Sequence, residues 1–163
     1  MIVNIKPLIF ALSLLPLSAL ACEKPQVTGY DLVDCLIDDL AIVQKNNKYG
    51  FVDKKGKIVI PVQYDLTWGF EEGLASVKQN DKWGFIDKTG EVIIPFKYQI
   101  AGLFIDGLAV VKLDNKYGFI DKTGKTAMPF QYDYASWGFE NGKAKVSLDG
   151  ENFYIDKTGK RID

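Results

Sequence analysis

The feature of this sequence that most restricts its fold is a unit of 34 residues that recurs along the chain. The last interval is 35 residues, because one extra residue lies ahead of Trp137. The repeat also extends towards the N-terminus as far as Tyr30, which lies 34 residues before Tyr64. Units of this kind cannot each bury an apolar face alone, so they are expected to stack on one another. The repeat is marked by a Gly-Phe pair, a Pro and a Tyr: Gly50-Phe51, Gly84-Phe85 and Gly118-Phe119; Pro61, Pro95 and Pro129; Tyr64, Tyr98 and Tyr132.

The spacing of turn residues indicates strands rather than helices. A 34-residue period also belongs to tetratricopeptide helix pairs, so the period alone leaves the fold class open. Asn, Asp, Gly or Pro interrupts every unit at short intervals, however, and helices do not persist through such interruptions. In the second unit, Asn80-Asp81 is a pair suited to the positive φ angles of a two-residue hairpin. Asp87-Lys88-Thr89-Gly90 has the residues of a type I turn.

These turns predict an all-β chain in which each unit is an antiparallel meander of three short strands. In the second unit the strands are expected at 74–79, 82–87 and 91–95, followed by a loop through Tyr98 and Gly102. Four such units are expected to stack into an open twisted array. A closed propeller-like ring is the alternative, because part of a unit lies at each end of the chain.

Most aromatic side chains are expected to build the core. Trp83 and Phe85 share one face of a strand, and the Gly84 between them indicates close approach of a neighbouring strand or of an aromatic ring. The Phe that opens each later unit is expected to stack along the array as one rung of a continuous core: Phe70, Phe104 and Phe139.

A few aromatic residues are candidates for binding a sugar or a peptide instead. Trp68 and Trp137 are expected in loops and have no tryptophan counterpart in the middle unit. The repeated tyrosines are further candidates: Tyr64, Tyr98 and Tyr132.

The second unit carries a family resemblance. Its segment Lys82-Trp83-Gly84-Phe85-Ile86-Asp87-Lys88-Thr89-Gly90, with the Ile94-Pro95 and Tyr98 that follow, resembles the WG repeat family, also called KWG repeats. The resemblance implies a β-rich module of a kind found chiefly in bacterial and often secreted proteins, with no established catalytic activity. Two units have Tyr-Gly in place of Trp-Gly, and the last has Phe153-Tyr154 and lacks the glycine, which suits a terminal cap.

The first 21 residues have the pattern of a secretory signal peptide. Lys6 precedes an apolar run from Pro7 to Leu17, and the segment ends on Ala19-Leu20-Ala21. The apolar run is only half the length that a spanning helix needs, so a membrane anchor is the alternative that we set aside. The chain is therefore expected to comprise a signal peptide at 1–21, a cap with a partial repeat at 22–39 and a repeat domain at 40–163, with no transmembrane span after cleavage.

Cleavage after Ala21 leaves Cys22 at the new N-terminus, with two possible fates. A disulfide between Cys22 and Cys35, the only other cysteine, fits an oxidising periplasmic or extracellular compartment. A lipid anchor on Cys22, as in bacterial lipoproteins, is the alternative, although Ala19 and Leu20 fit that motif poorly. The two fates exclude one another, because a lipidated Cys22 has no thiol to oxidise.

The remaining composition argues against catalysis and against several ligands. The chain has no histidine, which excludes histidine-based acid–base chemistry, nucleophile activation and metal ligation. Its formal net charge of −1 lacks the basic excess of a nucleic-acid binder. Asp38-Asp39 and Glu71-Glu72 are interpreted as solvated pairs rather than an acid–base dyad. The Asp-Lys turns are interpreted as structural rather than calcium-binding, and their lysines as protection of the strand edges: Lys54, Lys88, Lys122 and Lys157.

Together these observations predict a secreted module that is not an enzyme and needs no cofactor or metal. It is expected to bind a protein or cell-envelope polymer through an extended β surface, as repeat proteins generally do. The alternative is a carbohydrate-binding module that uses Trp68 and Trp137. A hydrolase that relies on carboxylates is the third hypothesis.

Overall fold

The computed structural model describes residues 22–162, so the predicted signal peptide at 1–21 lies outside the described residues. The described chain is all-β, as predicted, and forms four antiparallel sheets of four strands. The first two sheets contain β1 (Leu32–Ile37), β2 (Leu40–Lys45), β3 (Lys48–Asp53) and β4 (Ile58–Tyr64), then β5 (Leu66–Glu71), β6 (Leu74–Gln79), β7 (Lys82–Asp87) and β8 (Val92–Tyr98). The last two contain β9 (Ile100–Ile105), β10 (Leu108–Leu113), β11 (Lys116–Asp121) and β12 (Thr126–Tyr132), then β13 (Tyr134–Ala135), β14 (Ala144–Leu148), β15 (Glu151–Ile155) and β16 (Arg161–Ile162).

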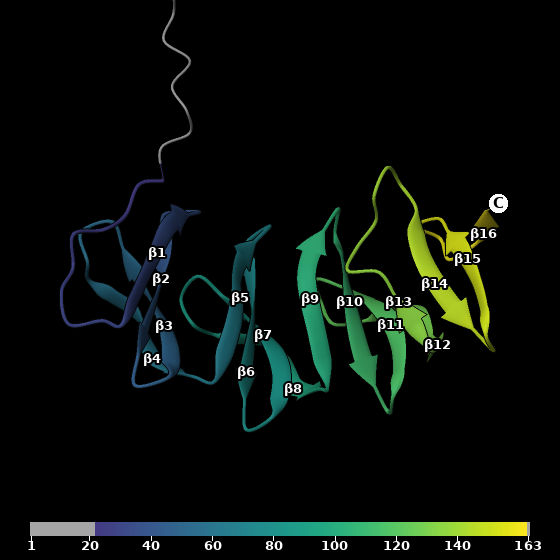
Figure 1. Cartoon of the computed structure of the whole chain (residues 1–163), viewed down its shortest axis with the longest axis horizontal. Coiled ribbons are helices and arrows are strands. Elements are labelled where there is room, and N and C mark those ends of the chain that lie inside the picture. The colour runs from purple at the N-terminus through teal and green to yellow at the C-terminus, as the bar shows by residue number, and fades with distance from the viewer. Residues whose placement is uncertain (1–21, 163) are drawn as a thin grey trace, which may run out of the picture.

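The four sheets follow one another in an open row. Within each sheet the strands lie in sequence order, which makes each repeat a simple meander. Figure 1 shows β1–β4 at one end of the long axis and β14–β16 at the other, so the array does not close into a ring. The prediction of an open array is therefore confirmed. Among residues 22–162, no helix has the length and apolar character needed to cross a membrane.

Each repeat has four strands rather than the predicted three. The segment after Tyr98, expected to be a loop, is strand β9, and β5 is its counterpart in the preceding unit. Both strands contain a β-bulge where they pair with the next strand, between Thr67 and Gly69 in β5 and opposite Val110 in β9. A bulge adds one residue on one side of the ladder, and this interrupts the alternation of apolar and polar residues by which a strand is recognised in sequence.

The glycine of each Gly-Phe pair lies where the backbone of the neighbouring strand comes closest. A Cβ atom on Gly84 would lie 2.7 Å from the carbonyl oxygen of Ile94 and 3.1 Å from the ring of Phe96. The pairing of β7 with β8 shifts register at this point. Both causes predicted for the glycine, a neighbouring strand and an aromatic ring, are thus present. In the last unit β16 pairs only with Tyr154 and Ile155, so Phe153, which pairs with Val146 of β14, has no described strand on its other side.

Adjacent sheets are joined by the same three contacts at each junction. The first is a pair of phenylalanine rings, with centroids 4.8 to 5.2 Å apart: Phe51 and Phe70, Phe85 and Phe104, Phe119 and Phe139. The second is a turn glycine against an apolar side chain of the preceding sheet: Gly90 on Ile60, Gly124 on Ile94, Gly159 on Met128. The third is an ion pair between turns: Lys88 with Asp38, Lys122 with Glu72, Lys157 with Asp106.

These junctions revise the interpretation of the turn lysines as edge protection. Three of the four lysines connect their own sheet to the sheet before it. Lys54 belongs to the first sheet and makes no ion pair within the described chain. Exposed ion pairs contribute little each, so the burial of the phenylalanines supplies most of the junction free energy and the ion pairs help to fix its register.

The outer face of the first sheet is covered by the N-terminal segment instead of a preceding sheet. A Cβ atom on Gly56 would lie 2.2 Å from Val27, so Val27 takes the place that Ile60 takes against Gly90. The segment is held by a disulfide between Cys22 and Cys35, whose Cα atoms are 5.2 Å apart. The backbone N–H of Leu36 also donates a hydrogen bond to the carbonyl oxygen of Glu23. The segment before β1 therefore covers this end of the array, and β1, which lies within the predicted cap at 22–39, is the first strand of the first sheet.

Candidate functional site: an aromatic cleft

Three residues at one position of the repeat create the candidate site. Counting back two residues from the first phenylalanine of each later unit gives Trp68, Gly102 and Trp137. The second and fourth units thus carry tryptophan where the third carries glycine. The two tryptophan rings approach one another across the third unit, with centroids 6.1 Å apart and planes inclined by 61°.

Trp68 projects outward because it is the extra residue of the bulge in β5. Thr67 precedes it and fixes the bulge with two hydrogen bonds: its hydroxyl donates to the carbonyl oxygen of Ser76 and accepts from the N–H of Gly69. One face of the Trp68 indole stacks on Trp83, with centroids 6.1 Å apart and planes within 6° of parallel. Trp83 is buried, whereas 52% of Trp68 remains exposed. Trp68 is therefore a supported platform with an open face.

Trp137 projects from a loop that the extra residue of the last unit creates. Strand β13 ends at Ala135, and Ser136 then takes the place of Thr67. The Ser136 hydroxyl donates to the carbonyl oxygen of Gly138 and accepts from the N–H of Lys145, which holds the loop around Trp137. Trp137 is 58% exposed. A hydroxyl residue immediately before the tryptophan thus positions both indoles.

Gly102 provides the space in which the two tryptophans meet. Its φ angle is not in the left-handed region, so the backbone does not require glycine there. A Cβ atom would lie 3.0 Å from Val110 and 3.4 Å from the ring of Trp137. The loop that carries Trp137 also packs on strand β9 at Ile105, since a Cβ atom on Gly138 would lie 3.0 Å from that side chain. The fourth unit therefore folds back onto β9 of the third.

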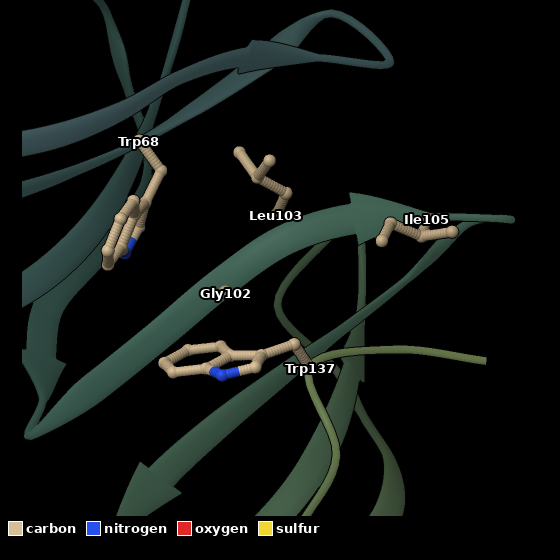
Figure 2. Close-up of a pocket in the computed structure, with 5 residues that line it drawn as sticks. All are labelled: Trp68, Gly102, Leu103, Ile105 and Trp137. Carbon is tan, nitrogen blue, oxygen red and sulfur yellow. The ribbon is translucent and has the colours of Figure 1, made fainter. Parts of the chain in front are cut away.

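The result is an apolar cleft of about 290 Å³. Figure 2 shows the two indoles on either side of β9 at Gly102, with Leu103 and Ile105 further along the strand. Within residues 22–162 neither indole N–H donates a hydrogen bond to the protein, so both are available to a ligand. The volume lies at the lower end of the range for small-molecule sites, which are mostly apolar with a few polar groups that orient the ligand.

No charged side chain of residues 22–162 lines the cleft. Hydrogen bonds from threonine hydroxyls lower the pKa of three turn carboxyls, and hydrogen bonds from lysines lower the pKa of three others. The six carboxyls are Asp87, Asp121, Asp156, Asp65, Glu72 and Asp133. Among the described residues, no group of three or more metal-ligating side chains gathers at one place. The cleft can therefore bind through ring faces and indole N–H groups.

The structure brings together two of the five predicted binding residues and places the others elsewhere. Trp68 and Trp137 form the cleft, although Trp68 lies on β5 and not in the predicted loop. The three tyrosines are core residues and line no surface site, which corrects their prediction as binding residues: Tyr64, Tyr98 and Tyr132, each at most 3% exposed. Their phenol rings cover the junctions between sheets, and burial raises the pKa of Tyr64.

Sequence reasoning missed the residues that shape the cleft between the tryptophans. Leu103 and Ile105 line it, and Gly102 leaves it open. A signal for them was present, because Trp68, Gly102 and Trp137 occupy equivalent positions once the extra residue of the last unit is allowed for. The hydroxyl residue and the glycine on either side of each tryptophan were a second signal.

An open row of meander sheets, joined by a repeated set of contacts, defines an all-β repeat protein. The particular family follows from sequence comparison: the model of the WG containing repeat matches at residues 29–49, 49–83, 83–117 and 117–151, and the chain belongs to this family. No curated protein matches the chain. Among solved structures, a plant lectin with two metal binding sites from Cicer arietinum is similar over 77% of this chain and 85% of its own, with 14% sequence identity and a TM-score of 0.33.

Proposed function

We propose that this chain is a non-catalytic binding module and that the cleft between Trp68 and Trp137 holds its ligand. The observation that carries the proposal is the exposure of two tryptophans whose positions are fixed by the surrounding residues. Each needs a hydroxyl residue to fix its bulge or loop, and Gly102 must leave the space between them. Large exposed aromatic side chains held rigidly are typical of binding sites.

A saccharide is the ligand class that the cleft favours. To sandwich a proline ring, two aromatic faces must stand roughly 7 to 8 Å apart, which is two van der Waals contacts. The indoles are too close and too steeply inclined for this. The inclined rings instead leave the exposed face of Trp68 free to stack against a flat ligand. A pyranose ring has an apolar C–H face for that surface and hydroxyls for the free indole N–H groups.

A protein or an envelope polymer without a saccharide component is the second candidate. The observation in its favour is the extended row of four sheets, which presents a repeated surface well beyond the cleft. Under either candidate the module acts in the periplasm or outside the cell. The signal-like segment at 1–21 and the disulfide between Cys22 and Cys35 support that location, and the disulfide favours a free N-terminal end over the lipid anchor on Cys22.

Titration of the protein with soluble cell-wall and storage glycans tests the proposal. Tryptophan fluorescence should change saturably for the wild-type protein, and calorimetry should give the same affinity. Trp68→Ala and Trp137→Ala should each weaken binding at least tenfold. Gly102→Leu keeps both indoles but fills the space between them, and should have the same effect.

Tyr134→Ala is the matched control, because Tyr134 is an exposed aromatic residue outside the cleft. It should leave the affinity unchanged. Circular dichroism must show the wild-type spectrum for each variant. Binding that is retained in both tryptophan variants, or that is absent from the wild-type protein across the glycans, would overturn the proposal in favour of the second candidate.

A further inference from the structure

A second hollow lies on the other side of Trp137. It has a volume of about 850 Å³ and shares the lining residues Ile105 and Trp137 with the cleft, so the two adjoin. Unlike the cleft, it has polar walls, to which Glu140, Asn141, Lys143, Lys145 and Tyr154 contribute. We refer to it as the polar groove.

The polar groove exists because the last unit departs from the repeat. Lys145 takes the position of Val110, and Tyr154 that of Phe119. In the third unit these positions are buried against the fourth sheet. In the fourth unit no sheet of the described chain covers them, so their side chains reach solvent. Lys143 similarly replaces the partly buried Leu108.

The charge of the groove is positive and is not neutralised by the protein. Its lining contains two lysines, Lys143 and Lys145, and one acid, Glu140. None of the three makes an ion pair within residues 22–162, whereas the lysines at the sheet junctions each have a carboxylate partner. The whole chain has a formal net charge of −1, so the net charge of the groove is opposite in sign to that of the molecule.

We infer that the ligand is an acidic oligosaccharide. One sugar ring lies in the cleft, and the carboxylate of an adjoining sugar lies in the polar groove between Lys143 and Lys145. The inference rests on the proposed saccharide-binding function and adds to it the charge of the ligand and a minimum length of two sugars. Ion pairing of a carboxylate with lysine ammonium groups favours an acidic over a neutral sugar.

The test uses uronic-acid oligosaccharides from pectin, alginate and hyaluronan, each as the free acid and as its methyl ester. Esterification removes the charge and keeps the ring. At low ionic strength the wild-type protein should bind at least one free acid about tenfold more tightly than its ester, and salt should reduce the difference. Lys143→Gln with Lys145→Gln should abolish this preference and leave the affinity for the ester unchanged. Glu140→Gln should strengthen binding of the acid about twofold.

The outcomes separate the two proposals. Equal binding of acid and ester by the wild-type protein would overturn the acidic ligand and leave the saccharide-binding cleft intact. A preference for the acid that survives in the double lysine variant would overturn the role of the groove. No binding of any acid or ester, or of any neutral glycan, would overturn the proposed function and this inference together.

Discussion

The ammonium group of Lys122 lies 2.9 Å from the carboxylate of Glu72, across the junction between the second and third sheets. The same ammonium donates a hydrogen bond to the backbone carbonyl oxygen of Glu72, and the carboxylate accepts one from the N–H of Gly107. One side chain thus connects the turns of two neighbouring repeats. Two further junctions have the corresponding lysine and acid, which makes this ion pair a part of the repeat itself.

Acid should weaken this junction in a defined pH range. The hydrogen bond from Lys122 lowers the pKa of Glu72 from its ordinary value of 4.5. A carboxyl whose pKa is lower in the folded state stabilises that state while it is ionised. The contribution is therefore complete above pH 4.5 and is lost as the pH falls through the lowered pKa.

Urea unfolding of the wild-type protein and of Lys122→Met at a series of pH values checks this. The variant should be less stable at pH 7 by about 0.5 kcal/mol, and the two free energies should converge at the lowest pH. A difference that stays constant from pH 7 to pH 2.5 would show that Lys122 acts through packing or its hydrogen bond to the Glu72 carbonyl oxygen, rather than through the Glu72 carboxylate.

Ser76→Ala should stabilise the protein. Ser76 is fully buried, and its hydroxyl has no hydrogen-bond partner among the described residues. An unsatisfied buried polar group costs about 1 to 3 kcal/mol, so its removal should raise the free energy of unfolding by about 1 kcal/mol. Thr67→Val is the contrasting variant, because the Thr67 hydroxyl makes two hydrogen bonds, and it should lower stability. Thermal unfolding distinguishes the two, and a destabilised Ser76→Ala would contradict the prediction.

Gly84→Ala should be far more harmful than Gly107→Ala. The new Cβ at position 84 would overlap the backbone of β8, which cannot move without breaking the ladder, and overpacking of this kind costs about 3 kcal/mol. Gly107 has nothing within 4 Å of its Cβ position but has a φ angle of +81°, so alanine there costs about 1 kcal/mol. Denaturant midpoints of the two variants provide the measurement, and equal losses would remove the close-approach explanation.

Loss of the disulfide should loosen one end of the array. Closure of a loop of 13 residues by Cys22 and Cys35 contributes at most about 3 kcal/mol. In Cys22→Ser with Cys35→Ser, we expect faster hydrogen exchange at Leu36 and in the first sheet next to Gly56, where Val27 packs. Exchange in the third and fourth sheets should not change. Uniformly faster exchange would show instead that the whole row unfolds as one unit.

The meander and its hairpins could be predicted because they depend on local residues. Asn80 and Asp81 both have positive φ angles, as their pair predicts, and the type I turn that begins at Asp87 is closed by a hydrogen bond from the N–H of Gly90. Strand β9 could not be predicted in the same way. Its bulge and Gly102 remove the alternation of apolar and polar residues on which such a prediction depends.

The junctions between sheets, and the meeting of Trp68 and Trp137 in one cleft, were not predicted because they depend on residues far apart in the chain. Lys122 was interpreted as edge protection, since nothing near it in sequence indicates Glu72 as its partner. The burial of Tyr98 likewise follows from the stacking of sheets, because it packs with Ala101 and Phe104 of the next sheet. The residue type alone does not distinguish a core tyrosine from a binding tyrosine, and the neighbouring sheet is what buries Tyr98.

The spacing of Trp68 and Trp137 ties the cleft to the number of repeats. Every junction uses the same contacts, so a duplicated middle unit would find compatible neighbours on both sides and the row would grow without a new fold. Such a duplication would, however, place two sheets between the tryptophans and move them out of contact. The proposed recognition by these two indoles would therefore limit the number of units between the second and the fourth, where the fold alone would tolerate a longer chain.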